Sequence, residues 1–318
     1  MTRPGVEVRR VGPEAAADVL SVVRRAFGAR APLDPPAAAL GDDLDSTATM
    51  LAGRGGLLAT LDGVPAGSLV LDPSPEGLFL RRFGVAPEAQ GRGVATALLD
   101  AARDAALGRP ALVVVAREEL PATIAFWERH GFVEHHRTGH DVELRLALEQ
   151  AYVAPQAADM RTLGAGLGRS LVPGDLVVLT GELGAGKTTF TQGLGEGLGV
   201  RGQVSSPTFV ITRVHPSLTD GPDLVHADAY RLGGVEELDD LDLDASLDAA
   251  VTVVEWGAGL AEAMSGAHLD VVIERALGGD IEDQSGDQSG DQSEHQPDDQ
   301  PDGGPDPRRI SMRWVVGK

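Results

Sequence analysis

The segment Gly181-Glu-Leu-Gly-Ala-Gly-Lys-Thr-Thr189 constrains the fold of this chain more than any other stretch. It matches the pattern G-x-x-x-x-G-K-[ST], in which glycines let successive backbone N–H groups turn inward toward an anion. The apolar run 176–180 before it predicts a buried strand, and residues 190–198 after it predict a helix. A helix N-terminus adds partial positive charge. The segment therefore predicts a phosphate-binding loop between a strand and a helix.

Lysine usage supports this interpretation over a chance match in a chain with 41 glycines. Lysine and arginine total 27, yet lysine occurs only at positions 187 and 318. A compact ammonium on a flexible stem fits among phosphates better than the planar fork of arginine. We expect Lys187 to reach the β- and γ-phosphates and the Thr188 hydroxyl to ligate Mg²⁺. The expected ATP-binding residues of the loop are Gly184, Ala185, Gly186, Lys187, Thr188 and Thr189.

Composition bounds the class of protein. At roughly 100–200 residues per domain, a length of 318 residues predicts two domains, placed at 1–150 and 155–318. The chain has no cysteine, which excludes disulfides and thiolate chemistry and fits a reducing compartment. No apolar run approaches about 18 residues and no basic and apolar leader opens the chain. We therefore expect a cytoplasmic protein without a membrane segment.

The net charge of −21 is spread unevenly. Residues 1–150 carry 20 acidic and 16 basic side chains, residues 151–275 carry 18 and 7, and residues 276–318 carry 10 and 4. No segment has the basic excess that binding to a phosphate backbone requires. Any nucleic acid is therefore expected to reach this chain through a partner protein.

Hydrophobic periodicity and turn residues predict alternating strands and helices in the first half. The Asp62-Gly63 pair predicts the turn of a hairpin, and residues 28–50 carry no clear pattern. The expected elements are strands at 6–10, 57–61, 66–71, 78–85, 112–116 and 142–146, and helices at 13–27, from about 96 to 106, and at 121–130.

Two segments of this half carry a family signature, Gln90-Gly-Arg-Gly-Val-Ala95 and Ile124-Ala-Phe-Trp-Glu-Arg-His-Gly-Phe132. They are similar to the Q/R-x-x-G-x-G/A loop and the helix followed by Gly-Phe of the GNAT family of acyl-CoA N-acyltransferases. The resemblance covers about residues 5–148 and implies an α+β domain with a mixed sheet. It also implies acetyl-CoA, with its pyrophosphate at main-chain N–H groups. The residues expected to bind it are Val85, Gln90, Arg92, Gly93, Val94, Ala95 and Thr96.

The proton chemistry of a transferase is harder to place. Where the GNAT family often has an Asn and a Tyr, this chain has Leu120 and Trp127, and neither side chain can give a proton to a thiolate. We interpret Trp127 as a core residue beside Phe126. Glu118, Glu119 and the pair His135-His136 are the polar candidates nearby, although an exposed surface explains them equally well. Binding of acetyl-CoA is expected, and acetyl transfer stays open.

The second half predicts a three-layer α/β domain around the phosphate loop. The small residues 149–158 predict a linker, and Asp159 is a plausible cap for a helix running to 168. Asp228 and Glu255 fall at the carboxyl ends of predicted strands, where ligands gather in such sheets. The other expected elements are a turn at 204–209, strands at 210–214, 224–232, 251–256, 268–274 and 309–316, and an acidic helical stretch at 236–247.

Four pieces occur in order here: the phosphate loop, Ser206-Pro-Thr-Phe209, His226-Ala-Asp-Ala-Tyr-Arg-Leu232 and Glu255-Trp256. Together they resemble the TsaE (YjeE) family, the ATPase subunits of the bacterial machinery that makes N6-threonylcarbamoyladenosine on tRNA. The resemblance covers residues 155–275. It implies that Thr162 lies near the nucleotide and that Thr208 belongs to a switch-like loop. The sequence departs from the family pattern at Glu182, where Asp is usual, and at Ala227, where an aromatic residue is usual.

The resemblance also implies the catalytic residues Lys187, Asp228 and Glu255, with Thr188, Asp228 and Glu255 at the metal. Carboxylate oxygens suit Mg²⁺, and a carboxylate beside the γ-phosphate can orient water. His226, Tyr230 and Trp256 are more simply structural residues, and Arg231 is either a helix-end ion pair or a contact to a partner or phosphate.

The expected function is an ATPase subunit for threonylcarbamoyl modification of tRNA, fused to an acetyltransferase-like domain. The implied partners are TsaD- and TsaB-type subunits, with tRNA contacted indirectly. Two alternatives stay open: a small P-loop kinase, or chiefly an acyl-CoA-binding or acetyltransferase protein regulated by ATP.

Residues 276–307 are low in complexity, with ten acidic residues and no lysine or arginine. Such a composition cannot bury enough apolar surface to fold, so it predicts a disordered insert. Strands predicted on both sides indicate an expanded hairpin loop rather than a tail.

Overall fold

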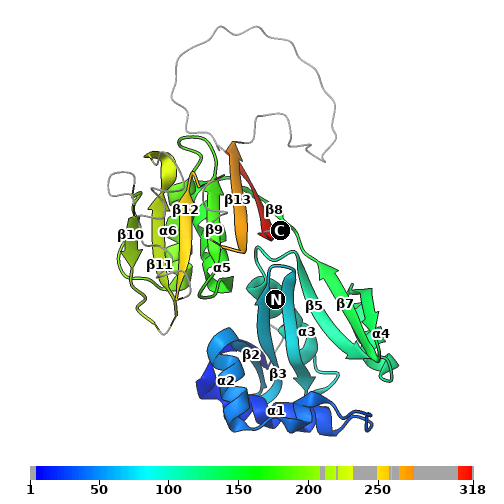
Figure 1. Cartoon of the computed structure of the whole chain (residues 1–318). Helices are drawn as coiled ribbons and strands as arrows, with labels where there is room; N and C mark the ends of the chain where they lie inside the picture. Colours follow the sequence, from blue (N-terminus) through cyan, green and yellow to red (C-terminus); the bar gives the residue numbers. More distant parts are fainter. Residues whose placement is uncertain are drawn as a thin grey trace, which may run out of the picture.

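The computed structural model describes residues 5–207, 212–219, 221–231, 249–257, 259, 265–275 and 307–316. Each half of the chain is built on its own seven-stranded sheet with helices packed against it (Figure 1). Both sheets mix parallel and antiparallel neighbours. This architecture confirms the predicted α/β class. No helix of the described part is long and apolar enough to cross a membrane.

Most elements of the first half lie where the periodicity predicted them, whereas the helix Leu44–Arg54 and the strand Val133–Thr138 were not predicted. In chain order they are β1 (Val6–Val11), η1 (Pro13–Ala15), α1 (Ala16–Gly28), η2 (Ala38–Gly41), α2 (Leu44–Arg54), β2 (Gly56–Leu61), β3 (Val64–Ser74), β4 (Gly77–Val85), η3 (Pro87–Ala89), α3 (Val94–Ala105), β5 (Ala111–Arg117), α4 (Pro121–Arg129), β6 (Val133–Thr138) and β7 (Asp141–Ala147). Asp62 and Gly63 have φ of 52° and 80° at the β2–β3 turn. Positive φ at both central residues is typical of a type I′ hairpin, so the hairpin prediction is confirmed.

The first sheet opens in its middle. Its order is β1-β2-β3-β4-β5-β7-β6, and β4 and β5 are its parallel pair. These two strands pair at Leu78–Leu112 and Phe79–Val113, and β4 then continues to Val85 without further pairing to β5. A register shift between β3 and β4 marks a bulge at Arg82, whose φ is 55°. The two strands therefore separate after Phe79 and Val113.

The second half contains the strand, loop and helix that the phosphate-loop motif predicted. Its elements are β8 (Ala151–Ala154), α5 (Ala157–Ser170), β9 (Leu176–Thr180), α6 (Lys187–Leu198), β10 (Thr212–His215), β11 (Asp223–Asp228), η4 (Ala229–Arg231), β12 (Ala250–Glu255), β13 (Ala267–Arg275) and β14 (Arg308–Val316). The sheet order is β10-β11-β12-β9-β13-β14-β8, with β11, β12, β9 and β13 parallel. The residues 208–211 and 236–247, which include Thr208 and the predicted acidic helix, lie outside the described residues.

Glycines bring α5 and α6 into direct backbone contact. A Cβ atom added at Gly164 would lie 2.2 Å from the carbonyl oxygen of Phe190, and one at Gly193 would lie 2.1 Å from that of Arg161. Gly168 and Gly197 are equally close to the opposite helix. Real Cβ atoms do not approach backbone oxygens so closely, so these positions require glycine. The abundance of glycine therefore serves packing as well as the phosphate loop.

Two predictions in the second half need correction. Residues 149–158 were predicted to be a linker, but Ala151–Ala154 forms β8 and pairs with the carboxyl-terminal strand β14. The predicted helix cap was Asp159, but α5 begins two residues earlier, and the Asp159 carboxylate instead accepts a hydrogen bond from the Gln156 N–H at 3.0 Å. The linker prediction failed because local sequence signals could not show the pairing of this segment with β14, and the cap prediction failed because Asp159 lies at the third position of the helix, with Gln156 as the N-cap.

The two halves are packed together rather than joined by a free tether. The Arg109 guanidinium, 2% exposed, donates to the Asp175 carboxylate at 2.9 Å and stacks on the Trp314 ring, 4.0 Å from its centroid. The Ser170 hydroxyl donates to the Leu107 carbonyl at 2.9 Å. These contacts link the end of α3 and the start of β5 to the end of α5 and the start of β9.

Candidate functional site

The phosphate loop follows β9 at the carboxyl edge of the parallel strands. Gly184 and Gly186 have φ of 77° and 107°, a region that favours glycine, and Gly186 caps the N-terminus of α6. A Cβ at Gly181 would lie 2.5 Å from the Ile273 carbonyl oxygen of β13. The glycine pattern of the motif is thus required by this loop geometry, and the loop presents a helix N-terminus.

Lys187 lies under the loop with its ammonium enclosed. Its Nζ donates to the carbonyl oxygens of Gly181 at 2.8 Å and Glu182 at 3.1 Å. It also lies 3.8 Å from the centroid of the Trp256 ring. Burial lowers the pKa of Lys187, and the nearby Glu255 and Asp228 carboxylates oppose that shift. The ammonium is therefore held at the loop by weak neutral partners that a phosphate could replace.

Trp256 is positioned by an uncommon backbone conformation. Its φ is 62°, and its N–H donates to the Leu179 carbonyl at 3.0 Å. Its ring also packs on Tyr230, with centroids 5.4 Å apart. A left-handed residue with a large side chain is strained, and such strain is often found at functional sites. Here it turns the indole under Lys187, so Trp256 has a structural role that touches the loop.

Glu255 is the centre of the polar contacts beside the loop. The side chain is 3% exposed, and its Oε1 accepts from the Thr188 hydroxyl at 3.2 Å and contacts His226 Nε2 at 3.0 Å. His226 itself is fully buried in β11. His226 is therefore a structural histidine with a specific role, which is to hold the Glu255 side chain in place.

Asp228 completes the carboxylate pair. It lies directly beside Glu255 in the parallel register of β11 and β12, is 4% exposed, and accepts from the Tyr230 N–H at 3.0 Å. The described part of the chain holds no cluster of three His, Cys, Asp or Glu side chains suited to a metal. Thr188, Asp228 and Glu255 instead form a set of one hydroxyl and two carboxylates. Hard oxygen donors of this kind fit Mg²⁺ with water and phosphate as further ligands.

The other two residues considered for this site are Thr162 on α5 and Arg231 in η4. Thr162 lies exposed on α5, and its hydroxyl donates to the Ala158 carbonyl of its own helix at 2.9 Å. The first turn of α5 does reach the loop, since Met160 Cε would lie 3.5 Å from a Cβ at Gly186. The side chain of Arg231 lies outside the described residues.

Sequence reasoning missed Arg308 at this site. Its guanidinium donates to the loop carbonyl oxygens of Ala185 at 3.0 Å and Gly184 at 3.5 Å. Arg308 starts β14, immediately after the acidic insert, and pairs in register with Arg275 at the end of β13. The available signal was a pair of arginines, Arg275 and Arg308, at the two ends of a stretch with no other lysine or arginine.

The first half contains a separate cavity of about 1000 Å³ between the diverging strands β4 and β5. Of the residues expected to bind acetyl-CoA, Val85, Gln90, Gly93, Val94, Ala95 and Thr96 line it. Arg92 does not: its side chain is exposed and pairs with Asp62 at 3.1 Å. Gly91 and Gly93 have φ of 74° and 85°, and Gly93 caps the N-terminus of α3. The cavity thus combines a helix N-terminus with enough room for a coenzyme arm.

Trp127 belongs to the core wall of this cavity. It is 4% exposed, and its ring packs edge-on against Phe83, Phe126 and Phe132 at centroid distances of 4.8, 5.0 and 5.1 Å. This confirms the interpretation of Trp127 as a packing residue. Leu120 lines the same cavity as the N-cap of α4.

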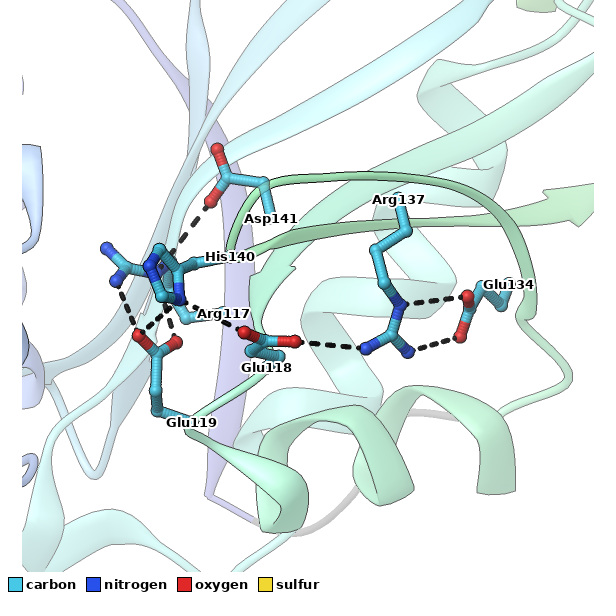
Figure 2. Close-up of polar contacts among 7 residues, drawn as sticks. All are labelled: Arg117, Glu118, Glu119, Glu134, Arg137, His140 and Asp141. Atoms are coloured by element: carbon cyan, nitrogen blue, oxygen red, sulfur yellow. Dashed lines mark hydrogen bonds and ion pairs between the residues drawn. The ribbon is translucent and has the colours of Figure 1, made fainter.

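A polar network lies at the end of β5, and Figure 2 shows its seven members. His140 Nδ1 contacts Glu118 at 3.0 Å and Glu119 at 3.1 Å, and Arg117 donates to Glu119 at 2.7 Å. Arg137 bridges Glu118 and Glu134. Of the polar candidates from the sequence, Glu118 and Glu119 are in this network, whereas His135 and His136 are exposed on β6. The two glutamates already have cationic partners, and only Arg117 and Asp141 of the network line the cavity.

Comparison with known proteins identifies the second half. The family model described as "Threonylcarbamoyl adenosine biosynthesis protein TsaE" matches residues 154–280. The protein called "tRNA threonylcarbamoyladenosine biosynthesis protein TsaE" in Streptomyces coelicolor is 65% identical over 120 residues, which are 37% of this chain and 81% of that protein. The chain belongs to the TsaE family. The TsaE protein of Mycobacterium bovis is 50% identical over 128 residues, 38% of this chain and 76% of that one.

The first half matches a different family. The model of the "Acetyltransferase (GNAT) family" covers residues 24–132. A crystal structure of the Paia N-acetyltransferase from Thermoplasma acidophilum in complex with coenzyme A spans 46% of this chain and 100% of that chain, with 15% identity and a TM-score of 0.40. At that similarity the assignment rests on the family model. The expected fusion of a GNAT domain with a TsaE domain is confirmed.

Proposed function

We propose that the TsaE half binds ATP and Mg²⁺, hydrolyses ATP, and supports threonylcarbamoyl modification of adenosine in tRNA. The observation that carries this proposal is the grouping of Lys187, Thr188, Asp228 and Glu255 at one edge of the sheet. The names of the relatives from Streptomyces coelicolor and Mycobacterium bovis supply the biological process.

Each residue of the group has a distinct task in this proposal. Lys187 exchanges its two carbonyl partners for phosphate oxygens, and the N–H groups of the loop and α6 bind the phosphates. Thr188 and Asp228 would ligate Mg²⁺, which supplies charge neutralisation when it is bound. Glu255, fixed by His226, lies where a carboxylate can ligate the metal and orient an attacking water.

The partners in this proposal are TsaD- and TsaB-type subunits, acting in the cytoplasm. The TsaE half carries 18 acidic and 7 basic residues over 151–275, so its own surface does not favour a phosphate backbone. We therefore propose that tRNA is bound by the partner subunits rather than by this chain.

The experiment that tests this proposal combines the full chain with TsaD- and TsaB-type proteins of the same source, tRNA and the substrates of threonylcarbamoyl transfer. Modified adenosine and released phosphate are measured with the parent chain and with Lys187→Ala. We expect modification and ATP turnover with the parent and neither with the variant. Arg309→Gln, an exposed change on β14, is the control and should behave as the parent. Modification that proceeds equally without Lys187 would refute the proposal.

For the GNAT half we propose binding of acetyl-CoA in the cavity between β4 and β5. The supporting observation is the α3 N-terminus with six of the seven expected residues along the cavity wall. Calorimetry with the full chain tests it. Affinity for acetyl-CoA should be lost when Gly93→Val blocks the left-handed turn and the approach to the loop, and a parent chain that binds no acetyl-CoA would disprove the assignment.

A further inference from the structure

The cavity of the GNAT half contains an arginine that no carboxylate of the described residues neutralises. Four arginines line the cavity, namely Arg30, Arg81, Arg82 and Arg117. Arg81 pairs with Asp72 at 3.1 Å, Arg82 makes two hydrogen bonds to Asp42, and Arg117 pairs with Glu119 at 2.7 Å. The guanidinium groups of these three arginines are therefore already paired with carboxylates.

Arg30 differs in its partners. It follows the end of α1, its guanidinium stacks 3.8 Å from the centroid of the Phe27 ring, and Nη2 donates to the Phe83 carbonyl at 3.3 Å. No carboxylate of the described residues lies within ion-pair distance of it. Burial lowers the pKa of Arg30, with no neighbouring charge that opposes the shift. The structure thus holds a half-buried cation over an aromatic ring, with one hydrogen bond from its guanidinium to the described residues.

A second feature sets the location of Arg30 apart from the coenzyme site. The pyrophosphate of a coenzyme is accounted for by the N–H groups of the loop at Gly93 and the N-terminus of α3. Arg30 instead comes from the segment after α1 and reaches the Phe83 carbonyl of β4, next to Arg82 in the bulge. The cavity wall also includes the apolar side chains of Phe27, Leu33, Leu120 and Phe126. Arg30 is therefore available for a second anion beside the pyrophosphate, one that the acceptor can supply.

We propose that the acceptor is a small apolar amine that carries a carboxylate, such as an apolar α-amino acid, and that Arg30 binds this carboxylate. The planar guanidinium is suited to a bidentate contact with a carboxylate. The proposal rests on acetyl-CoA binding in the same cavity. In the reaction, the amine nitrogen bonds to the acetyl carbonyl carbon and the C–S bond breaks. The proton lost by the nitrogen ends on the thiolate, which gives the N-acetyl compound and free coenzyme A.

The test uses the full chain and pairs of amines that differ only at the carboxylate: L-phenylalanine with L-phenylalaninamide, and L-methionine with L-methioninamide. Release of coenzyme A thiol is measured against amine concentration. Because a charge-assisted contact is lost in the amides, we expect KM to be about tenfold or more lower for the acids. Arg30→Gln should raise KM for the acids by a similar factor, leave the amides unchanged, and leave kcat largely intact. Arg30→Lys should recover part of the affinity.

A binding measurement makes the test independent of turnover. Calorimetry is done on the chain saturated with coenzyme A, with N-acetyl-L-phenylalanine and its amide as ligands. The acid should bind about tenfold or more tightly than the amide, and Arg30→Gln should remove the difference. Arg24→Gln, an exposed change on α1, is the matched control, and melting temperatures check that the variants fold.

The outcomes separate the possible anions. If Arg30→Gln weakens acetyl-CoA binding and lowers the affinity for acids and amides equally, Arg30 binds the coenzyme phosphates. The proposal is then overturned. Equal binding of acid and amide by the parent chain, or no binding of either, overturns it as well. A parent chain that fails to bind acetyl-CoA at all refutes the coenzyme assignment instead, which the calorimetry shows separately.

Discussion

Glu255 illustrates how one carboxylate is prepared for a task by its neighbours. The buried His226 and the Thr188 hydroxyl contact the same oxygen, Oε1, at 3.0 and 3.2 Å. The second oxygen has no such restraint from these two residues. A side chain held at one oxygen keeps a fixed orientation, so its other oxygen can bind a ligand without rearrangement of the side chain.

We expect Glu255→Gln to keep ATP binding and lose most hydrolysis. The change removes the negative charge with little change in volume, and a positioned base or water-orienting group is worth roughly 10²–10⁴ in rate. Phosphate release and calorimetry with ATP measure the two properties. Glu274→Gln, an exposed change on β13, is the control. Normal hydrolysis by the Glu255 variant would remove this residue from the mechanism.

At the scale of elements, β14 supports the phosphate loop from outside the motif. Arg308 donates to the carbonyl oxygens of Gly184 and Ala185, and these two bonds restrain the peptide groups of the loop. The strand that carries Arg308 is reached only after the acidic insert. The loop geometry therefore depends on a strand more than 100 residues later in the chain.

Arg308→Gln is expected to raise the Kd for ATP by about tenfold, since two charge-assisted hydrogen bonds to the loop are weakened. The melting temperature should stay near that of the parent, because Arg308 is only partly buried. Arg309→Gln changes the neighbouring residue, which points to the opposite face of the strand. Equal ATP affinity in the two variants would contradict a positioning role for Arg308.

The hairpin β13–β14 closes without its insert. Arg275 and Arg308 are direct partners in its register, so the strands already meet where the insert begins and ends. Loop closure costs only about 0.6 kcal/mol per doubling of length. Replacing residues 279–307 by a short turn should therefore leave the melting temperature and ATPase activity nearly unchanged. A large drop in melting temperature would mean that the insert contributes packing.

Elements with a strong internal pattern were predictable, and elements defined by distant partners were not. The strand before the phosphate loop and the helix after it follow from their own residues. In contrast, β6 has six exposed residues and shows no alternation, and β8 has four residues and exists because β14 pairs with it. The helix α2 was hidden in a segment without periodicity, although Asp43 caps it by accepting from the Ser46 N–H.

The same distinction holds for the sites. Lys187, Thr188, Asp228 and Glu255 were predictable because a motif and two strand ends fix their places. Arg30 and Arg308 were not, since their importance lies in contacts to Phe83 and to the loop carbonyls that only the tertiary fold creates.

On the scale of the whole molecule, a buried ion pair joins the GNAT domain to the TsaE domain. Arg109 is 2% exposed and holds Asp175, the residue just before β9. Burial raises the pKa of Asp175, and Arg109 opposes that shift. The charge of Asp175 therefore depends on its partner from the other half.

Arg109→Ala should destabilise the chain by about 3–5 kcal/mol, because it leaves a buried carboxylate unpaired. The loss should be smaller at lower pH. A carboxyl whose folded pKa is raised binds its proton more tightly in the folded state, so its destabilising effect appears as pH rises through that pKa. Denaturant unfolding at several pH values measures this. The double change Arg109→Ala with Asp175→Asn should recover part of the stability. If it does not, the destabilisation comes from another contact of Arg109, such as its stacking on Trp314.

The strand β9 connects this ion pair to the phosphate loop, with Asp175 before it and Gly181 after it. Its five residues span about 17 Å, and it is bonded on one side to β12 and on the other to β13. A strand paired in this way cannot slide without breaking both ladders, so it acts as a fixed spacer between the ion pair and the phosphate loop. What the fusion supplies is then a fixed ratio: every TsaE domain is made together with one GNAT domain, and the buried ion pair and β9 keep the two at a set distance.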